Sequence, residues 1–276
     1  MGKCLVTKLS GVVDNNELLK IEEFQIDITG NSEIWVGLPS NVSVDARIVG
    51  KGYFTDEKYA ANNGDKKQIA NQVDSNSYDY GYSKVYVTGT NCKLLIGGKY
   101  KLTQLRTNGE CGINIMEQLS FCKNISEYLT ESAHEYNIVD IFNTFPLLKI
   151  ASLKFNGDIS KLKSSSIQQI WSNSKRDDLY GDISKAPETL YYVKNGSFDW
   201  NSTRSASAFI IGLTHCIVKN IDAMLINQAN CTAKEDVVSY LKLINVSGEN
   251  RTNASNDAIA TLQSKGYTVS VPAATE

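Results

Sequence analysis

The chain has 276 residues, more than one hydrophobic core readily organises, so two domains or one elongated domain are expected. It carries 28 Lys and Arg residues against 30 Asp and Glu residues, and the net charge of −2 removes the electrostatic basis for binding nucleic acid or an anionic membrane. A hydrophobic content of 42% argues against disorder, and two histidines are too few for a multi-histidine metal site.

The first residues of the chain show no targeting pattern. Residues 1–8 contain no apolar core followed by a small-residue cleavage site, so no secretory signal is predicted. No apolar run approaches the roughly 18 residues that a membrane-spanning helix needs. We therefore expect a protein that is made in the cytoplasm and does not insert into a membrane.

Apolar and polar residues alternate through much of the first hundred residues. Across residues 42–48, for example, every second residue is apolar, which places the apolar set on one face of a sheet. Clusters rich in Gly and Asn separate such runs and indicate turns. The expected strands cover residues 4–9, 24–28, 34–38, 42–48, 84–88, 93–96 and 99–105. Short strands at this spacing, with no helices between them, predict an antiparallel β-sandwich.

A short motif occurs twice in the second half of the chain. The sequence Gly-Asp-Ile-Ser-Lys begins at Gly157 and again at Gly181, 24 residues later. Upstream of the first copy, Leu147, Ile150 and Leu153 follow an L-x-x-L-x-x-L spacing. Periods of roughly 20 to 29 residues with this apolar spacing are typical of leucine-rich repeats, in which each repeat adds one strand beside the last.

Helices and strands are expected to alternate towards the carboxyl end. The first helix covers residues 233–241, with Thr232 and Glu235 as its capping box, and the second covers residues 254–262 and ends at Gly266. The expected strands are residues 224–226, 243–246 and 267–271. The whole chain is thus predicted to be α+β, with an N-terminal antiparallel β-sandwich (1–106) for anchoring and oligomerisation, followed by a leucine-rich-repeat-like α/β solenoid (107–276).

Few residues offer catalytic or metal-binding chemistry. The six cysteines form no C-x-x-C pair, which favours buried free thiols over zinc or redox sites. Cys122 and His134 would need to meet in space to form a dyad, and the adjacent His215 and Cys216 point to opposite faces of a strand. We predict no catalytic, metal-binding or cofactor-binding residue. An enzyme on the N-terminal domain stays an alternative, because a fold does not dictate function.

Two groups of residues are candidates for an interaction surface. Tyr78, Tyr80 and Tyr82 alternate in a polar stretch, and tyrosine supplies wide contact area at low entropic cost. The alternative is an aromatic strand face that packs on its own core. Candidates on the strand side of the repeats are Lys154, Gln169 and Tyr191, for which ordinary solvated surface is the alternative.

Several segments resemble a known group of proteins. They are the Met-Gly-Lys-Cys-Leu-Val-Thr-Lys-Leu opening (residues 1–9), the Gly-Tyr-Phe-Thr-Asp segment (52–56), the two Gly-Asp-Ile-Ser copies and the carboxyl end (258–271). Together they are similar to small proteins of Bacteroidales gut bacteria and their crAss-like phages, in which a β-domain precedes leucine-rich repeats. The resemblance implies no catalytic or ligand residue that can be carried over.

The resemblance implies a non-enzymatic structural protein of the virion, such as a head fibre or capsid decoration. It would be assembled in the host cytoplasm and would bind capsid or other virion proteins through its N-terminal domain. The repeats would present a binding face to a host surface protein or glycan. A homo-oligomer is expected, because a small β-domain with Tyr-rich edges gains from partners.

The alternative is a host-cell leucine-rich-repeat binding module or adhesin for a protein or glycan ligand. Copy number separates the two interpretations, because a decoration protein occurs in multiples set by capsid symmetry and a solitary adaptor does not.

Overall fold

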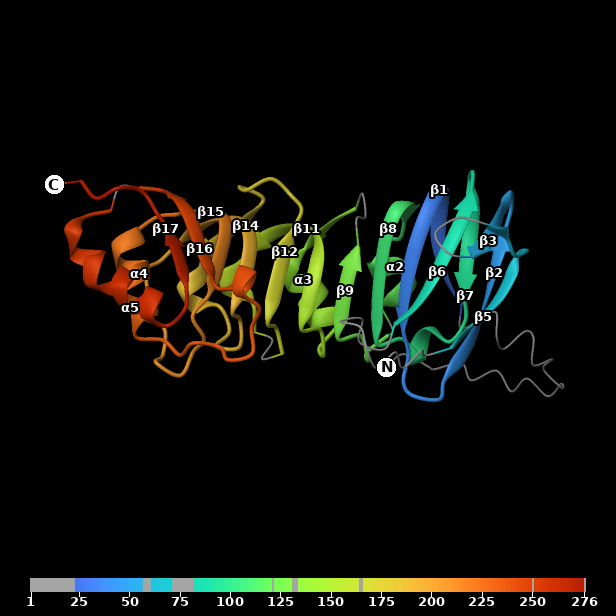
Figure 1. Cartoon of the computed structure of the whole chain (residues 1–276), viewed down its shortest axis with the longest axis horizontal. Helices are drawn as coiled ribbons and strands as arrows, with labels where there is room; N and C mark the ends of the chain where they lie inside the picture. Colours follow the sequence, from blue (N-terminus) through green and yellow to red (C-terminus); the bar gives the residue numbers. More distant parts are fainter. Residues whose placement is uncertain are drawn as a thin grey trace, which may run out of the picture.

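The computed structural model describes residues 23–56, 61–70, 82–120, 122–130, 134–163, 166–249 and 251–275. They form an elongated molecule whose strands follow one another along its long axis (Figure 1). The 17 strands among these described residues belong to a single mixed sheet, and the protein is mostly β. The prediction of an α+β chain, with a sandwich followed by an α/β solenoid, is therefore wrong. The physical reason is that the antiparallel and parallel strands share one hydrogen-bonded sheet, and helices contribute little.

The first part of the sheet is antiparallel. Its strands are β1 (Phe24–Gly37), β2 (Ser43–Val49), β3 (Gly52–Asp56), β4 (Ala61–Asn62), β5 (Lys66–Ala70), β6 (Tyr82–Gly89), β7 (Cys92–Ile96) and β8 (Gln104–Gly112). The first half of β1 pairs with β7 and its second half with β6, while β8 lies along its other side. Two strands were expected where β1 runs unbroken. Where a turn was predicted, the strand continues instead, and its pairing with β8 shifts register between Ile28 and Ser32.

From β8 onwards the main strands pair in parallel. They are β9 (Glu127–Thr130), β11 (Ile150–Asp158), β12 (Gln169–Ser172), β14 (Tyr192–Asp199), β15 (Gly212–Val218), β16 (Leu243–Gly248) and β17 (Thr268–Ser270). Two shorter strands, β10 (Glu135–Asn137) and β13 (Leu179–Asp182), pair with the far ends of β11 and β14. One buried residue per strand is aligned with the next: Leu105, Tyr128, Ala151, Ile170, Val193, Leu213 and Ile244. This row is the core of the parallel part.

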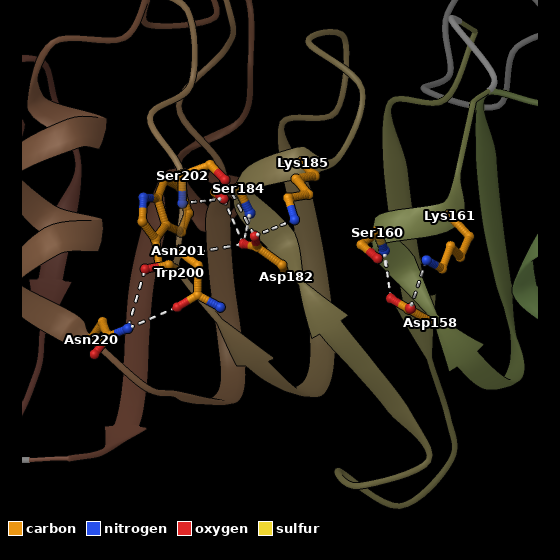
Figure 2. A network of polar contacts seen from close by, with 10 residues as sticks. All are labelled: Asp158, Ser160, Lys161, Asp182, Ser184, Lys185, Trp200, Asn201, Ser202 and Asn220. Atoms are coloured by element: carbon orange, nitrogen blue, oxygen red, sulfur yellow. Dashed lines mark hydrogen bonds and ion pairs between the residues drawn. The ribbon is translucent and has the colours of Figure 1, made fainter.

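The repeated motif forms the same local structure twice. Gly157 and Gly181 have φ of 107° and 108°, a region that glycine enters without strain. The aspartate that follows each glycine, Asp158 or Asp182, caps a short 3₁₀ helix, η2 (Ile159–Lys161) or η3 (Ile183–Lys185), by accepting from a serine N–H. Figure 2 shows that Asp182 also accepts from the backbone N–H of Asn201 on the next turn, at 3.2 Å. The motif therefore joins successive turns of the chain.

Four α-helices lie among the described residues, two of them at the carboxyl end of the molecule (Figure 1). They are α2 (Ile115–Leu119), α3 (Ile138–Thr144), α4 (Ile221–Ala229) and α5 (Asn256–Ser264), with 3₁₀ turns η1 (Lys99–Lys101), η4 (Ser239–Leu241) and η5 (Asn253–Ser255). In the part of the chain that the structure describes, no helix is long and apolar enough to cross a membrane.

The carboxyl-terminal predictions are confirmed in part. The expected strands at 243–246 and 267–271 are β16 and β17, and the helix over 254–262 is α5, which ends before Gly266 at φ 85°. The segment 224–226 lies within α4, because a short apolar run does not distinguish a strand from a buried helix. The helix expected over 233–241 is absent from that segment, where only η4 forms.

Other boundaries also shift. Thr232 does not cap a helix but donates its hydroxyl to the carbonyl of Ala206 at 2.9 Å. The strand expected over 99–105 begins only at Gln104, after η1, and the one over 4–9 lies outside the described residues. The domain division at residue 106 stays a prediction. That position lies inside β8, which is hydrogen-bonded to both β1 and β9.

Candidate ligand-binding groove

A groove of about 770 Å³ runs along one face of the sheet, where the antiparallel and parallel parts meet. Its floor is formed by β1, β6, β8, β9, β11 and β12, and the segment before β16 forms one wall. Five aromatic side chains line it: Trp35, Tyr82, Trp171, Tyr191 and Tyr240. Polar side chains lie among them: Arg106, Asn108, Glu127, Ser152, Gln169, Asn173 and Asp236. Rings and planar polar groups are thus mixed on one concave surface.

Strand register places seven side chains of this face in one line, which we call the tryptophan row. Residues paired directly across neighbouring strands point to the same face of a sheet. The row is Lys84, Trp35, Arg106, Leu129, Ser152, Trp171 and Lys194, from β6, β1, β8, β9, β11, β12 and β14. Trp35 and Trp171 are four strand spacings apart, or about 19 Å at ~4.8 Å per strand.

At one end of the row a buried glutamine fixes the aromatic side chains. Gln169, only 8% exposed, accepts a hydrogen bond from Trp171 Nε1 at 3.0 Å and donates one to the Tyr191 hydroxyl at 2.6 Å. The ring of Tyr192 lies 4.6 Å from that of Trp171, centroid to centroid. Because both ends of the Gln169 amide are used, the Trp171 ring is held in one orientation before any ligand arrives.

At the other end, Trp35 is flanked by cations. Its Nε1 donates to Glu33 at 2.6 Å, which fixes the indole. Lys84 Nζ lies 4.1 Å from the ring centroid and Arg106 Cζ lies 4.6 Å from it, both within the range of cation–π attraction. The Tyr82 ring meets the indole edge-on at 5.8 Å. The indole N–H of Trp35, like that of Trp171, thus donates to the side chain two residues earlier on its own strand.

Glu127 lies on the groove floor between these two ends. Burial raises the pKa of its carboxyl, against the lowering effects of a hydrogen bond with Tyr82 and of the Arg106 charge. Its strand neighbours in register are Gln104 on β8 and Ile150 on β11. The floor therefore carries a carboxylate whose charged form is partly desolvated, beside a guanidinium.

The wall of the groove exposes apolar surface. Val237 and Leu241 pack against the buried rings of Tyr191 and Tyr192. Val238 and Tyr240, from the same segment, are 46% and 61% exposed. Large apolar side chains exposed at the mouth of a groove are typical of surfaces that contact a ligand or partner.

The groove brings together three of the six candidate interaction residues. Tyr82, Gln169 and Tyr191 all line it, although Gln169 and Tyr191 are buried rather than solvent-covered. Lys154 is on β11, two residues beyond Ser152, and does not line the groove; Tyr78 and Tyr80 lie outside the described residues.

Sequence reasoning missed Trp35, Arg106, Glu127 and Trp171. For the two tryptophans, the alternation of apolar residues along the strand was an available signal. Trp35 lies between Ile34 and Val36, which are fully buried, so alternation alone turns the indole towards the outer face.

None of the five cysteines that the structure describes lines the groove. Cys122 and Cys216 are buried, and burial raises the pKa of their thiols to about 11 and about 12 respectively. They are therefore protonated at neutral pH and are poor nucleophiles. His215 is exposed and Cys216 is buried, and the strand is irregular between them, with φ 57° at His215. Among the described residues no group of three His, Cys, Asp or Glu side chains is placed to hold a metal ion.

The groove thus combines fixed aromatic rings, planar polar groups and an open floor. No family model matches the chain, and no curated protein or solved structure matches it either.

Proposed function

We propose that this protein is a non-enzymatic binding module that holds an extended carbohydrate chain in the groove. The observation that carries the proposal is the tryptophan row, with a fixed indole near each end and hydrogen-bonding side chains between them. Sugar rings have apolar C–H faces that pack on aromatic rings, and hydroxyl groups that pair with planar amides, carboxylates and guanidinium groups. The groove supplies both kinds of partner.

The rigidity of the groove favours binding. Its floor consists of hydrogen-bonded strands, and the side chains that would contact a sugar are held by one another, as Gln169 holds Trp171. Binding to a preorganised surface loses less conformational entropy than binding to a mobile one. The separation of about 19 Å between the tryptophans, at ~4.8 Å per strand, suits a chain of several sugar units rather than a single one.

Binding without catalysis is the simpler use of these groups. Glycoside hydrolysis generally uses two carboxyl groups that flank the scissile bond. On the floor that the structure describes, the lining carboxylate is Glu127, which is engaged with Tyr82 and Arg106, while Asp236 stands on the wall. Release of shorter products from a bound polysaccharide would contradict this part of the proposal.

The test is a binding screen of the whole chain against an array of neutral and acidic polysaccharides, followed by titration calorimetry. Trp171→Ala should weaken binding about tenfold, because an aromatic contact contributes about 0.5–1.5 kcal/mol beyond its buried area. Tyr180→Ala is the matched control, since Tyr180 is 49% exposed on β13 and does not line the groove. Equal loss in both variants, or binding of peptides but no glycan, would overturn the proposal.

Display on a phage particle stays a prediction from the sequence, as does homo-oligomerisation. A glycan-binding module on a virion would serve attachment to a host surface, so the two proposals are compatible. Mass spectrometry of purified particles should detect the chain if it is a virion component, and its absence there would remove that proposal.

A further inference from the structure

We infer that the carbohydrate is acidic, with carboxylate or sulfate groups that bind the cations beside the two tryptophans. This inference rests on the proposed function and deepens it by naming the ligand class. Three of the seven residues in the tryptophan row are cations, Lys84, Arg106 and Lys194, and none of the seven is acidic. In a chain with a net charge of −2, such a row marks a local preference for anions.

The cations are held in place by the rings. Lys84 and Arg106 belong to strands on opposite sides of β1, so they flank Trp35, and both are exposed. A guanidinium that is already stacked on a ring loses little freedom when it forms a bidentate pair with a carboxylate or sulfate. One end of the groove is therefore a preformed anion site next to an aromatic surface.

The other end repeats the arrangement. Lys194 Nζ lies 6.0 Å from the centroid of Trp171, the residue with which it is in register. Lys234 Nζ lies 6.0 Å from the ring of Tyr191 and 5.2 Å from that of Phe209. Each end of the groove thus places a cation beside an aromatic side chain.

Acidic groups near the groove offset only part of this charge. Glu33 accepts the Trp35 indole N–H, Asp236 stands on the wall, and Glu127 lies on the floor with a carboxyl whose charged form burial disfavours. The four cations, Lys84, Arg106, Lys194 and Lys234, thus outnumber these three acids.

The experiment compares polygalacturonate with its carboxyl-reduced form, which keeps the sugar chain and removes the charge. Sulfated chondroitin and its desulfated form make a second pair, and a fifteen-nucleotide oligothymidylate is the third arm. The whole chain is titrated with each by calorimetry at low and at physiological salt. At least one acidic polymer should bind about tenfold more tightly than its neutral counterpart, and its affinity should fall with salt.

Variants separate the charge effect from folding. Arg106→Gln should weaken binding of the acidic polymer about fivefold to tenfold and binding of the neutral polymer by much less. Arg106→Lys should restore part of the loss. Lys51→Gln, an exposed site outside the groove, is the matched control and should change neither. Thermal melting of each variant shows whether the fold is kept.

The contrary results distinguish failure of this inference from failure of the proposed function. Equal binding of the acidic and neutral polymers would overturn this inference and leave the proposed function standing. Binding of neither polymer of either pair would overturn both. Tighter binding of the oligothymidylate than of any glycan would replace the carbohydrate with single-stranded nucleic acid.

Discussion

The two ends of the molecule pair their strands in different ways, antiparallel at one end and parallel at the other. In the antiparallel part, β2, β6 and β7 alternate strictly between buried and more exposed residues, and β1 alternates on either side of its irregularity. In the parallel part, each strand adds one residue to the aligned buried row, and the spacing between strands is set by turns such as those at Gly157 and Gly181. The groove lies where these two arrangements meet, so its residues come from both.

The largest effects should come from the core, and they test whether the two ends fold together. Phe54 and Phe155, one at each end, are fully buried and belong to one continuous apolar cluster. Replacing either with alanine should reduce the free energy of unfolding by about 3–5 kcal/mol. Because the cluster is continuous, both variants should shift the same transition in urea, followed by tryptophan fluorescence and by circular dichroism. Two separate transitions would show that the ends fold independently.

Alanine substitutions at two glycines, one in each part of the molecule, compare how tightly the turns are packed. A Cβ on Gly181 would lie 2.0 Å from Asp158 Oδ1, and its φ is 108°, so Gly181→Ala should destabilise by about 2–4 kcal/mol. Gly64 has φ 81° but nothing within 4 Å of a Cβ, so Gly64→Ala should lose only about 1 kcal/mol, from backbone strain alone. Similar losses in urea titrations would contradict the tight stacking of the repeated motif.

Loss of the two Gln169 hydrogen bonds should have the next largest effect on stability. Gln169→Leu leaves the Trp171 indole N–H and the Tyr191 hydroxyl without this partner, so stability should fall by about 1–3 kcal/mol and glycan binding should weaken. Gln104→Leu is the control in the same row of the floor, where the side chain packs on Gly37. It should change stability by less than about 0.5 kcal/mol. Urea unfolding and calorimetry measure both effects.

The smallest effects on stability should come from pH. They have opposite signs for the carboxyl groups of Glu127 and Asp182. Burial raises the pKa of Glu127, so the folded state favours its protonated form and loses that stability as pH rises through the raised pKa. Glu127→Gln should therefore be more stable than the native chain at neutral pH, with the difference disappearing in acid.

Asp182 shows the reverse dependence. Burial raises the pKa of this carboxyl. Hydrogen bonds from Ser184, Asn201 and Lys185 together lower it by more than burial raises it, so the net pKa is below its usual value. Its contribution to stability is present above the ordinary aspartate pKa and lost as pH falls through the lowered one. Asp182→Asn should thus lose stability at neutral pH and approach the native chain in strong acid. Unfolding curves across pH check both carboxylates.

Local patterns predicted several of the strands but not how they join. Alternation located β2, β6 and β7, and the carboxyl-terminal pattern located α5, because these depend on neighbours in sequence. The run 224–226 was misassigned because three apolar residues fit either period. The single mixed sheet depends on β8 pairing with β1 on one side and β9 on the other, which no local pattern encodes.

The same limit applies to the groove. Tyr82, Gln169 and Tyr191 were chosen as surface candidates, one by one, and the structure places all three along it. The tryptophan row could not be predicted, since Trp35, Arg106 and Trp171 are aligned only through the register of strands that are far apart in sequence.

The most direct test of the central claim is the dependence of binding on chain length, measured by calorimetry with digalacturonate and octagalacturonate. If the groove holds one extended glycan across both tryptophans, the octamer should bind at least tenfold more tightly than the dimer. Trp35→Ala and Trp171→Ala should each remove most of that gain. Equal affinity for the two lengths, or an octamer affinity that survives both substitutions, would contradict the account.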